Sequence, residues 1–325
     1  MKKSLLLLAG LALFGFTHNA KAQFGYGKPE DIEKLKKRKL IVIVESPDED
    51  LMKKLTKKKK TEDIKSYQTA LDMYNSQMKE VIEKFWTFSS TDIEYKTQKE
   101  VDKLPKGQYA LIYCSSGSNG PGTKHEGLAW TPAGDKVEGD MITVMAVALQ
   151  ENNKPIYFLG MPDGFPTKAD LVYGITQLEW YFNYRVSHQK ATMKEGKELI
   201  AENQPRLKRR TLLLRQDQLD TKLKPEEIKT AYPFNYRTVT ADEMDQYVVN
   251  ADSNFAYAII APSYGGSQVI YVQYVMDCKD GAQLGMSMPS MGGMMLGGYT
   301  GGSGHSIITK KTLADYCEYI SGKKK

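Results

Sequence analysis

Two hydrophobic periodicities alternate along this chain of 325 residues. From residue 61 to 85 apolar side chains recur three and four positions apart, which predicts one long amphipathic helix. Residues 39–45 form a continuous apolar run bounded by charges, typical of a strand buried on both faces. Residues 141–149 and 155–161 are apolar runs separated by a polar turn, which predicts a β-hairpin. The chain therefore mixes helices and strands.

One arrangement of residues occurs twice. Residues 97–113 and 240–260 both begin with Thr-x-x-Glu, a capping box in which the Thr and Glu side chains bond to backbone N–H groups at the start of a helix. A short amphipathic helix follows in each copy. An apolar strand comes next, and Tyr109-Ala-Leu-Ile is aligned with Tyr257-Ala-Ile-Ile. The pattern indicates an internal duplication.

The segments after this pattern also correspond in order. Each copy continues with a hairpin, then a Met-Pro dipeptide (Met161 and Met288), then a helix that begins at Thr-Lys (Thr167 and Thr309). We therefore expect the α/β (α+β) class, with two tandem units of the form β-α-β-α-β-β-β-α. Each unit should be a mixed sheet with helices packed on it.

The amino-terminal residues have the features of an export signal. Lys2 and Lys3 precede an apolar run, residues 5–16, and Ala20-Lys21-Ala22 is an A-x-A cleavage site. We expect cleavage after Ala22, a periplasmic or extracellular location and no lipid anchor. The expected organisation is a signal peptide (1–22), a polar lead-in (23–38), a first unit (39–187), a charged helical connector (188–210) and a second unit (211–325).

Composition and charge argue against a nucleic-acid partner and against a cation site. A hydrophobic content of 41% indicates packed cores, and the formal net charge of +6 is modest. The lysine runs, of which residues 57–60 are one, lack interleaved aromatic residues, so we expect solvated faces and no nucleic-acid partner. The acidic cluster at 45–50 is better explained as the first turn of a helix than as a cation site.

Few side chains suit catalysis or metal binding. The three cysteines have no zinc-ligand spacing, and if any pair is bridged, Cys278 with Cys317 is the favoured one. No Gly-x-Ser-x-Gly or His-Glu-x-x-His motif occurs. No metal and no cofactor are expected, although thioether binding of copper(I) remains a third, minor interpretation.

Residues 86–182 and 231–321 share the order of capping box, helix, Tyr-Ala-aliphatic strand, hairpin and helix. This order resembles, at the level of the fold, the domain common to the amino-terminal part of TolB and to CsgG. Those families are non-enzymatic components of the bacterial cell envelope. The resemblance implies a role in envelope binding or assembly, and it carries over no functional residue.

The two units differ in their insertions, where added function is most expected. Unit one has residues 115–140 after its Tyr109 strand, and unit two has a Met- and Gly-rich segment, 289–304, after its hairpin. If the hairpin strands are antiparallel, both insertions leave from the carboxyl edge of the sheet, where α/β proteins usually bind ligands. The candidate binding residues are Lys124, His125, Glu126 and Trp130 in the first insertion, and Met291, Met294, Met295, Leu296 and Tyr299 in the second.

These observations favour an exported, non-enzymatic protein that binds or scaffolds an envelope protein through loops 115–140 and 289–304. Methionine-rich loops are adaptable apolar surfaces, so a peripheral membrane contact through residues 289–304 is also compatible, as is a homo-oligomer. The alternative is a hydrolase or transferase of envelope polysaccharide or peptide, with its site near His125, Glu126 and Trp130. Paired carboxylates near Trp130 would favour that enzyme.

Overall fold

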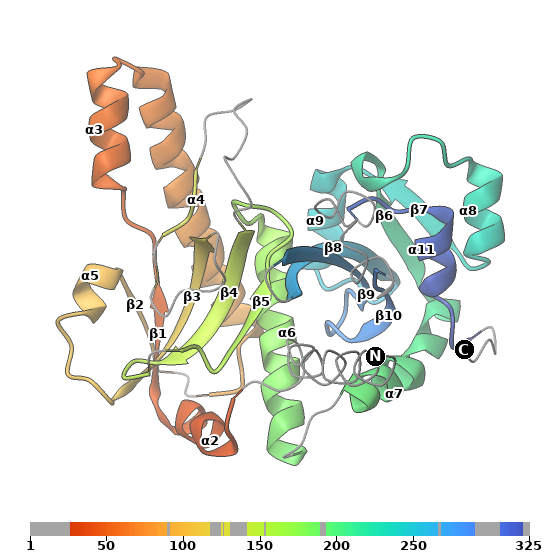
Figure 1. Cartoon of the computed structure of the whole chain (residues 1–325), viewed down its shortest axis with the longest axis horizontal. Helices are drawn as coiled ribbons and strands as arrows, with labels where there is room; N and C mark the ends of the chain where they lie inside the picture. The colour runs from red at the N-terminus through yellow and green to blue at the C-terminus, as the bar shows by residue number, and fades with distance from the viewer. Residues whose placement is uncertain are drawn as a thin grey trace, which may run out of the picture.

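The computed structural model describes residues 27–89, 92–117, 125, 127–130, 142–152, 154–188, 193–265, 268–289 and 306–320 (Figure 1). Unit one contains α2 (Pro29–Lys37), β1 (Lys39–Ile43), α3 (Glu49–Lys57), α4 (Thr61–Phe85), β2 (Ile93–Lys96), α5 (Gln98–Val101), β3 (Tyr109–Gly117), β4 (Ile142–Leu149), β5 (Tyr157–Gly160) and α6 (Lys168–Ser187). Unit two contains α7 (Met193–Asn203), the 3-10 helix η1 (Gln204–Arg209), β6 (Thr211–Arg215), the 3-10 turn η2 (Gln216–Gln218), α8 (Pro225–Ala231), β7 (Tyr236–Val239), α9 (Ala241–Val249), β8 (Phe255–Gly265), β9 (Gln268–Asp277), β10 (Gln283–Ser287) and α11 (Lys310–Asp315).

The chain has the predicted mixed α/β fold, and its two sheets have the same topology. The strand order is β2-β1-β3-β4-β5 in sheet A of unit one and β7-β6-β8-β9-β10 in sheet B of unit two. The first three strands of each sheet are parallel, and the remaining two continue as antiparallel hairpin strands. Two similar units of this kind are what a tandem duplication produces.

Strand pairing corrects the alignment of the two copies by two residues. Tyr109 pairs with Lys39 at the start of β1, and Phe255 pairs with Thr211 at the start of β6. Phe255 is therefore the counterpart of Tyr109, and the sequence alignment with Tyr257 was wrong. The error arose because Tyr-Ala recurs two positions later in β8, so sequence identity and strand register disagree.

The helix starts follow the predicted capping boxes. The Thr97 backbone N–H donates to Glu100 Oε2 at 2.8 Å, and the Thr240 N–H donates to Glu243 Oε2 at 2.9 Å. Thr167 and Thr309 cap α6 and α11 in the same manner, as their shared Thr-Lys start suggested. Residues 86–88 lie in no strand, and the Thr87 and Phe88 N–H groups bond to the Glu179 side chain of α6.

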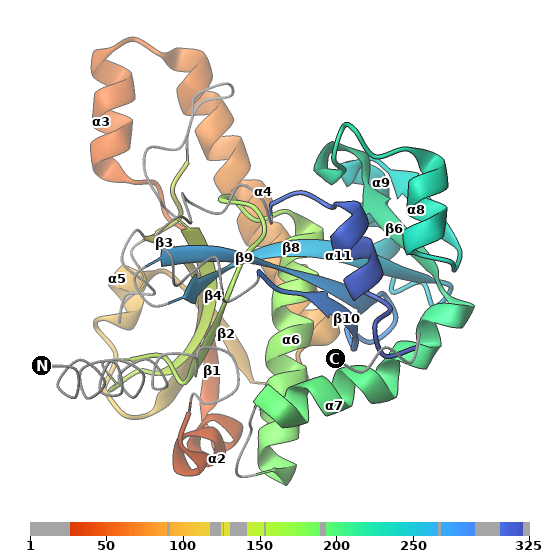
Figure 2. The same ribbon diagram turned by 45° about the vertical axis from the view of Figure 1, so that its right-hand side comes forward.

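Helix α6 lies between the two sheets, and it is the main link between the units (Figures 1 and 2). Thirteen of its 20 residues are buried, so both sides of the helix are covered. Its apolar side chains belong to one continuous cluster with residues of α4 and sheet A and with residues of sheet B. The two units therefore share a hydrophobic core.

The sheet faces are covered in a repeating manner. In unit one, α4 and α6 belong to the cluster on one face of sheet A, and α5 belongs to the cluster on the other. In unit two, α8 and α11 cover one face of sheet B, and α9 lies on the opposite face. That opposite face packs against α6 of unit one. The equivalent α5 face of unit one has no such helix among the described residues.

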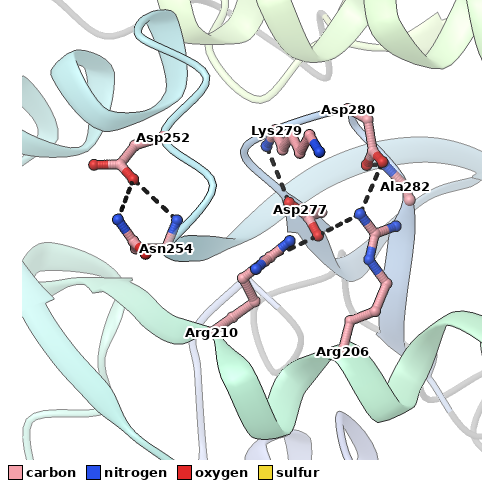
Figure 3. A network of polar contacts seen from close by, with 8 residues as sticks. All are labelled: Arg206, Arg210, Asp252, Asn254, Asp277, Lys279, Asp280 and Ala282. Carbon is pink, nitrogen blue, oxygen red and sulfur yellow. Dashed lines mark hydrogen bonds and ion pairs between the residues drawn. The ribbon is translucent and has the colours of Figure 1, made fainter.

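An ion-pair network ties each unit's first strand to its hairpin turn. Arg210, which precedes β6, donates from Nε to Asp277 Oδ2 at 3.2 Å, and Arg206 Nη2 lies 2.7 Å from the same oxygen (Figure 3). In unit one, Arg38 precedes β1 and contacts Glu151 through both of its terminal nitrogens. Helix α7 and η1, which lie in the expected connector, pack against β10 of unit two.

All three cysteines are buried thiols, and none of them is in a disulfide bond. Cys278 belongs to the core against α6, whereas Cys317 belongs to the cluster on the opposite face of sheet B. The pair favoured from the sequence is therefore not bridged. Among the described residues, no helix combines the length and the apolar character needed to cross a lipid bilayer.

Candidate functional site

Both insertions leave from the carboxyl edges of their sheets, as predicted. β3 ends at Gly117 and pairs in antiparallel fashion with β4, so residues 118–141 connect two strands at that edge. β10 is antiparallel to β9, which places its end, Ser287, at the equivalent edge of sheet B. The structure describes His125 and Trp130. The other candidates lie outside the described residues: Lys124, Glu126, Met291, Met294, Met295, Leu296 and Tyr299.

His125 forms a buried pair with Glu45, just beyond the carboxyl end of β1. The His125 Nε2 atom lies 2.5 Å from Glu45 Oε1, and the two side chains are only 7% and 4% exposed. Asn75 of α4 holds the Glu45 backbone at both its N–H (2.8 Å) and its carbonyl oxygen (2.9 Å). Asn75 therefore holds the backbone that carries the Glu45 carboxylate, and this carboxylate in turn contacts the imidazole ring.

The described part of the insertion folds back along β3. The Ser116 N–H donates to the Gly127 carbonyl oxygen at 3.0 Å, and the Ala129 N–H donates to Ser116 Oγ at 3.0 Å. This places the Trp130 ring 5.2 Å from the Tyr67 ring of α4, measured between centroids. A second ring contact lies at the same edge of sheet A, where Tyr113 and His125 pack in a T-shaped arrangement with their ring centroids 6.1 Å apart.

The described groups around His125 do not assemble a nucleophile, base and orienter. Cys114, the nearest candidate thiol in sequence, is fully buried on the α4 side of β3, and burial raises the pKa of its thiol to about 12. A thiol with that pKa is a poor nucleophile at neutral pH. In the described part of the chain, no three His, Cys, Asp or Glu side chains are placed to hold a metal ion.

A cavity of about 140 Å³ extends from His125 along the α5 face of sheet A. Its floor is apolar, and α5 and the β4–β5 turn form its rim. Two residues that line it, Tyr113 and Gln150, each have a polar side-chain atom that is buried without a hydrogen-bond partner among the described residues, the Tyr113 hydroxyl and Gln150 Oε1. Burial raises the pKa of Tyr113 to about 12, so its hydroxyl stays protonated and can donate. The apolar lining of the cavity includes Ile43, Val101, Leu111 and Ala148, which belong to the cluster on that face of sheet A.

The counterparts of these residues in unit two are apolar and packed. The Gln150 N–H donates to the Tyr109 carbonyl oxygen, and the Cys278 N–H donates to the Phe255 carbonyl oxygen. Because Phe255 is the counterpart of Tyr109, Gln150 corresponds to Cys278. The same register matches Tyr113 with Ile259 and Ala148 with Met276. Ile259, Met276 and Cys278 all belong to the core that contains α6. The unit-one cavity thus occupies the position that α6 fills in unit two.

The carboxyl edge of unit two carries an acidic cluster at its junction with α6. Asp170, at the start of α6, is 4% exposed, and burial, followed by the nearby Asp163, holds the pKa of its carboxyl well above the usual range. Burial likewise raises the pKa of Asp245 in α9 to about 6. Arg215 lies 3.5 Å from Asp163 and offsets part of this negative charge.

Sequence reasoning found His125 and Trp130 but missed their partners. Glu45 was assigned to the acidic start of α3, although the capping residue of that helix is Asp48, whose side chain accepts from the Asp50 and Leu51 N–H groups. Glu45 lies two residues after Ile43, on the α5 side of the strand. This alternation along the strand was the signal that could have identified Glu45 as a site residue. Nothing local in the sequence marks Gln150, because its role depends on the space left beneath α5.

No family model, no curated protein and no solved structure matches this chain. The functional argument therefore depends on the geometry of the site.

Proposed function

We propose that the protein is an exported, non-enzymatic binding protein of the cell envelope, and that unit one holds a partner protein. The partner contacts the carboxyl edge around Trp130 and inserts one side chain into the cavity beneath α5. The fold-level resemblance to the TolB and CsgG domain supports the same proposal. Loop 289–304 belongs to the same proposal as a second contact, although it lies outside the described residues.

The observation that carries this proposal is a pair of buried polar atoms on residues that line the cavity, neither of which has a hydrogen-bond partner among the described residues. A buried polar atom without a partner destabilises the folded state by about 1–3 kcal/mol, so native structures rarely retain one without a reason. Here two such atoms, Tyr113 Oη and Gln150 Oε1, belong to residues that line one cavity. A single inserted group that donates to Gln150 Oε1 and also bonds to the Tyr113 hydroxyl, such as a hydroxyl or a primary amide, would satisfy both atoms.

The cavity size limits what can enter. A cavity of about 150 Å³ accommodates a ring the size of benzene, and this one measures about 140 Å³. One amino-acid side chain has that size, and interfaces commonly gain most of their affinity from one or two such buried anchors. A partner side chain with an apolar stem and an amide or hydroxyl end fits the apolar floor and the two polar atoms.

The test compares two variants with a matched control in pull-downs from envelope extract. Ala148→Met copies the residue of unit two, Met276, and fills the cavity. We expect a folded protein that no longer retains the partner. Tyr113→Phe removes one hydroxyl and should weaken retention about 3- to 10-fold, the effect of one hydrogen bond. Retained proteins are identified by mass spectrometry.

Tyr232→Phe is the control, because the Tyr232 hydroxyl is also buried without a described partner but lies in the opposite core of unit two. It should retain the partner as the unmodified chain does. If Ala148→Met unfolds at the temperature of the unmodified protein and retains the same proteins, the cavity has no role in binding and the proposal fails.

A further inference from the structure

Helix α3 and the first turns of α4 form an arm that projects beyond sheet A (Figures 1 and 2). In α3 only Leu55 is buried, and in α4 the buried positions begin at Tyr67, so the far end of the arm has little apolar packing. Unit two has the seven-residue α8 between its first two strands instead. The arm is thus an addition specific to unit one.

The tip of the arm is strongly basic. Residues 53–65 contain seven lysines and two acidic residues. Four consecutive lysines, 57–60, are exposed at the turn between the helices. Lys60 pairs with Asp63 at 2.9 Å, but Lys57, Lys58 and Lys59 have no ion pair within the described part of the chain.

The turn has a lysine where its backbone favours glycine. The Lys60 N–H donates to the Leu55 carbonyl oxygen and the Lys59 N–H to that of Thr56, which together form a Schellman motif at the end of α3. Lys59 has φ +54°, in the left-handed region. Glycine adopts this conformation without the steric penalty that a Cβ brings, and it is the usual residue there.

The start of α4 has a second unfavourable choice. Lys60 is the N-cap residue, and its side chain caps no backbone N–H. Ser, Thr, Asp or Asn normally fills this position, and positive charge at a helix amino terminus opposes the helix dipole. Two of the four lysines therefore occupy positions that favour other residues, Lys59 because of its backbone conformation and Lys60 because of the cap and the helix dipole. Such a local conflict is typical of a functional site.

We propose that this tip docks on an anionic lipid surface through the phosphate groups of the lipids. The tip is convex and projecting, so it can reach a flat surface before the rest of unit one does. Lysine is a hydrated point charge on a flexible stem, which suits diffuse attraction to many phosphates better than the recognition of one. This inference does not depend on the proposed partner.

Docking also orients the candidate site. The arm begins at Asp48, three residues after Glu45, at the carboxyl edge of β1. A tip held on the membrane therefore turns the edge that carries His125 and Trp130 toward the lipid surface. A partner bound by unit one would then lie next to the membrane.

The test is co-sedimentation of the full chain with vesicles of phosphatidylglycerol and phosphatidylethanolamine, compared with vesicles of phosphatidylcholine alone. We expect binding to the anionic vesicles only, with loss as salt is raised from 50 to 500 mM, because surface charges are screened. Lys59→Gly/Lys60→Ser should reduce binding about 25-fold, since each lysine near the surface contributes about fivefold. The same variant should melt at a temperature about 2–4 °C higher, because it restores the preferred turn and cap residues.

Lys222→Gln/Lys229→Gln is the charge-matched control, because it removes two exposed lysines around α8, the counterpart of the arm. It should bind within twofold of the unmodified chain. Equal losses in both variants would mean that net charge alone drives binding, and the proposal would be overturned. Absence of binding at 50 mM salt, or release by 10 mM inorganic phosphate at constant ionic strength, would also overturn it.

Discussion

The α5 face of unit one and the α9 face of unit two are the same surface of a duplicated fold, and they have different environments. In unit two this face packs against α6, and Ile259, Met276 and Cys278 are buried in the shared core. In unit one the corresponding Tyr113, Ala148 and Gln150 line a cavity of about 140 Å³. One surface became a structural interface, and its copy became a candidate binding site.

The comparison shows why the open face belongs to unit one. In a tandem repeat, the terminal helix of one unit covers the next unit. The first unit has no preceding neighbour, so another element must cover its outer face. In unit one, α5 and the polar residues at the cavity rim cover this face. Helix α5 has four residues, whereas α9 has nine. A short helix leaves space beneath it.

The largest effect is expected where α6 meets sheet B. Tyr173 is 2% exposed and belongs to the same apolar cluster as Tyr257 and Tyr274. Tyr173→Ala should lower the free energy of unfolding by about 3–5 kcal/mol, the usual effect of truncating a large buried aromatic side chain. Denaturant unfolding followed by circular dichroism measures this value.

Leu104→Ala is the matched change on the open face, because Leu104 is a partly buried residue packed on the α5 side of sheet A. It should destabilise by about 1 kcal/mol only, since partial burial contributes less area. Equal losses from the two variants would mean that both faces are packed to the same extent, and the comparison would lose its basis.

The fold was largely predictable from the sequence because its signals are local. Capping boxes, apolar periodicity and turn residues depend on neighbours within four positions, so α4 was predicted with its observed bounds, Thr61–Phe85. Strand register was less accessible, since Tyr109 resembles Tyr257 in sequence although it corresponds to Phe255 in pairing. Register depends on long-range contacts that no local pattern records.

The site was predictable only in part, for the same reason. The insertion after β3 drew attention to His125 and Trp130, and antiparallel hairpin pairing confirmed the edge from which it leaves. Glu45 lies 80 positions away from His125 in the chain, and their contact exists only in the folded state. The cavity depends on the short α5 and on the absence of a covering helix among the described residues, which are properties of packing.

A pH series sharpens the contrast between the two carboxyl edges. Burial raises the pKa of Asp245 in unit two to about 6, against 3.8 in the unfolded chain, and it raises that of Asp170 as well. Above pH 6 the folded state must hold the partly buried Asp245 carboxylate ionised, which is destabilising. Protonation relieves this as pH falls from about 7 toward 4, so these two groups make the folded state more stable at pH 5 than at pH 7.

Asp245→Asn isolates the contribution of this residue. It should raise the unfolding free energy at pH 7 by about 1–2 kcal/mol, with solvent screening of a partly exposed group taken into account. It should also reduce the difference in unfolding free energy between pH 7 and pH 5. The neighbouring charges are Asp163, Asp170, Asp242 and Arg215. A variant whose pH profile matches that of the unmodified chain would show that Asp245 is not perturbed by burial.

Hydrogen exchange tests the smallest difference, the independent opening of α5. The Val101 and Asp102 N–H groups bond only within α5, to the Thr97 and Gln98 carbonyl oxygens, whereas α9 lies against the shared core. We therefore expect α5 amides to exchange through local opening and α9 amides only on global unfolding. Thr97→Ala, which removes a cap worth about 1 kcal/mol, should speed α5 exchange about fivefold without changing the melting temperature.

Thr240→Ala makes the same chemical change at the start of α9, and the opposite outcome is expected. Because α9 opens only with the whole molecule, loss of its cap should lower the melting temperature by about 2–4 °C and speed the slowest amides throughout the chain. If Thr97→Ala also lowers the melting temperature to that extent, α5 is as firmly integrated as α9. The space beneath it would then be a fixed packing defect, and a partner side chain could enter only through the rim that the structure shows.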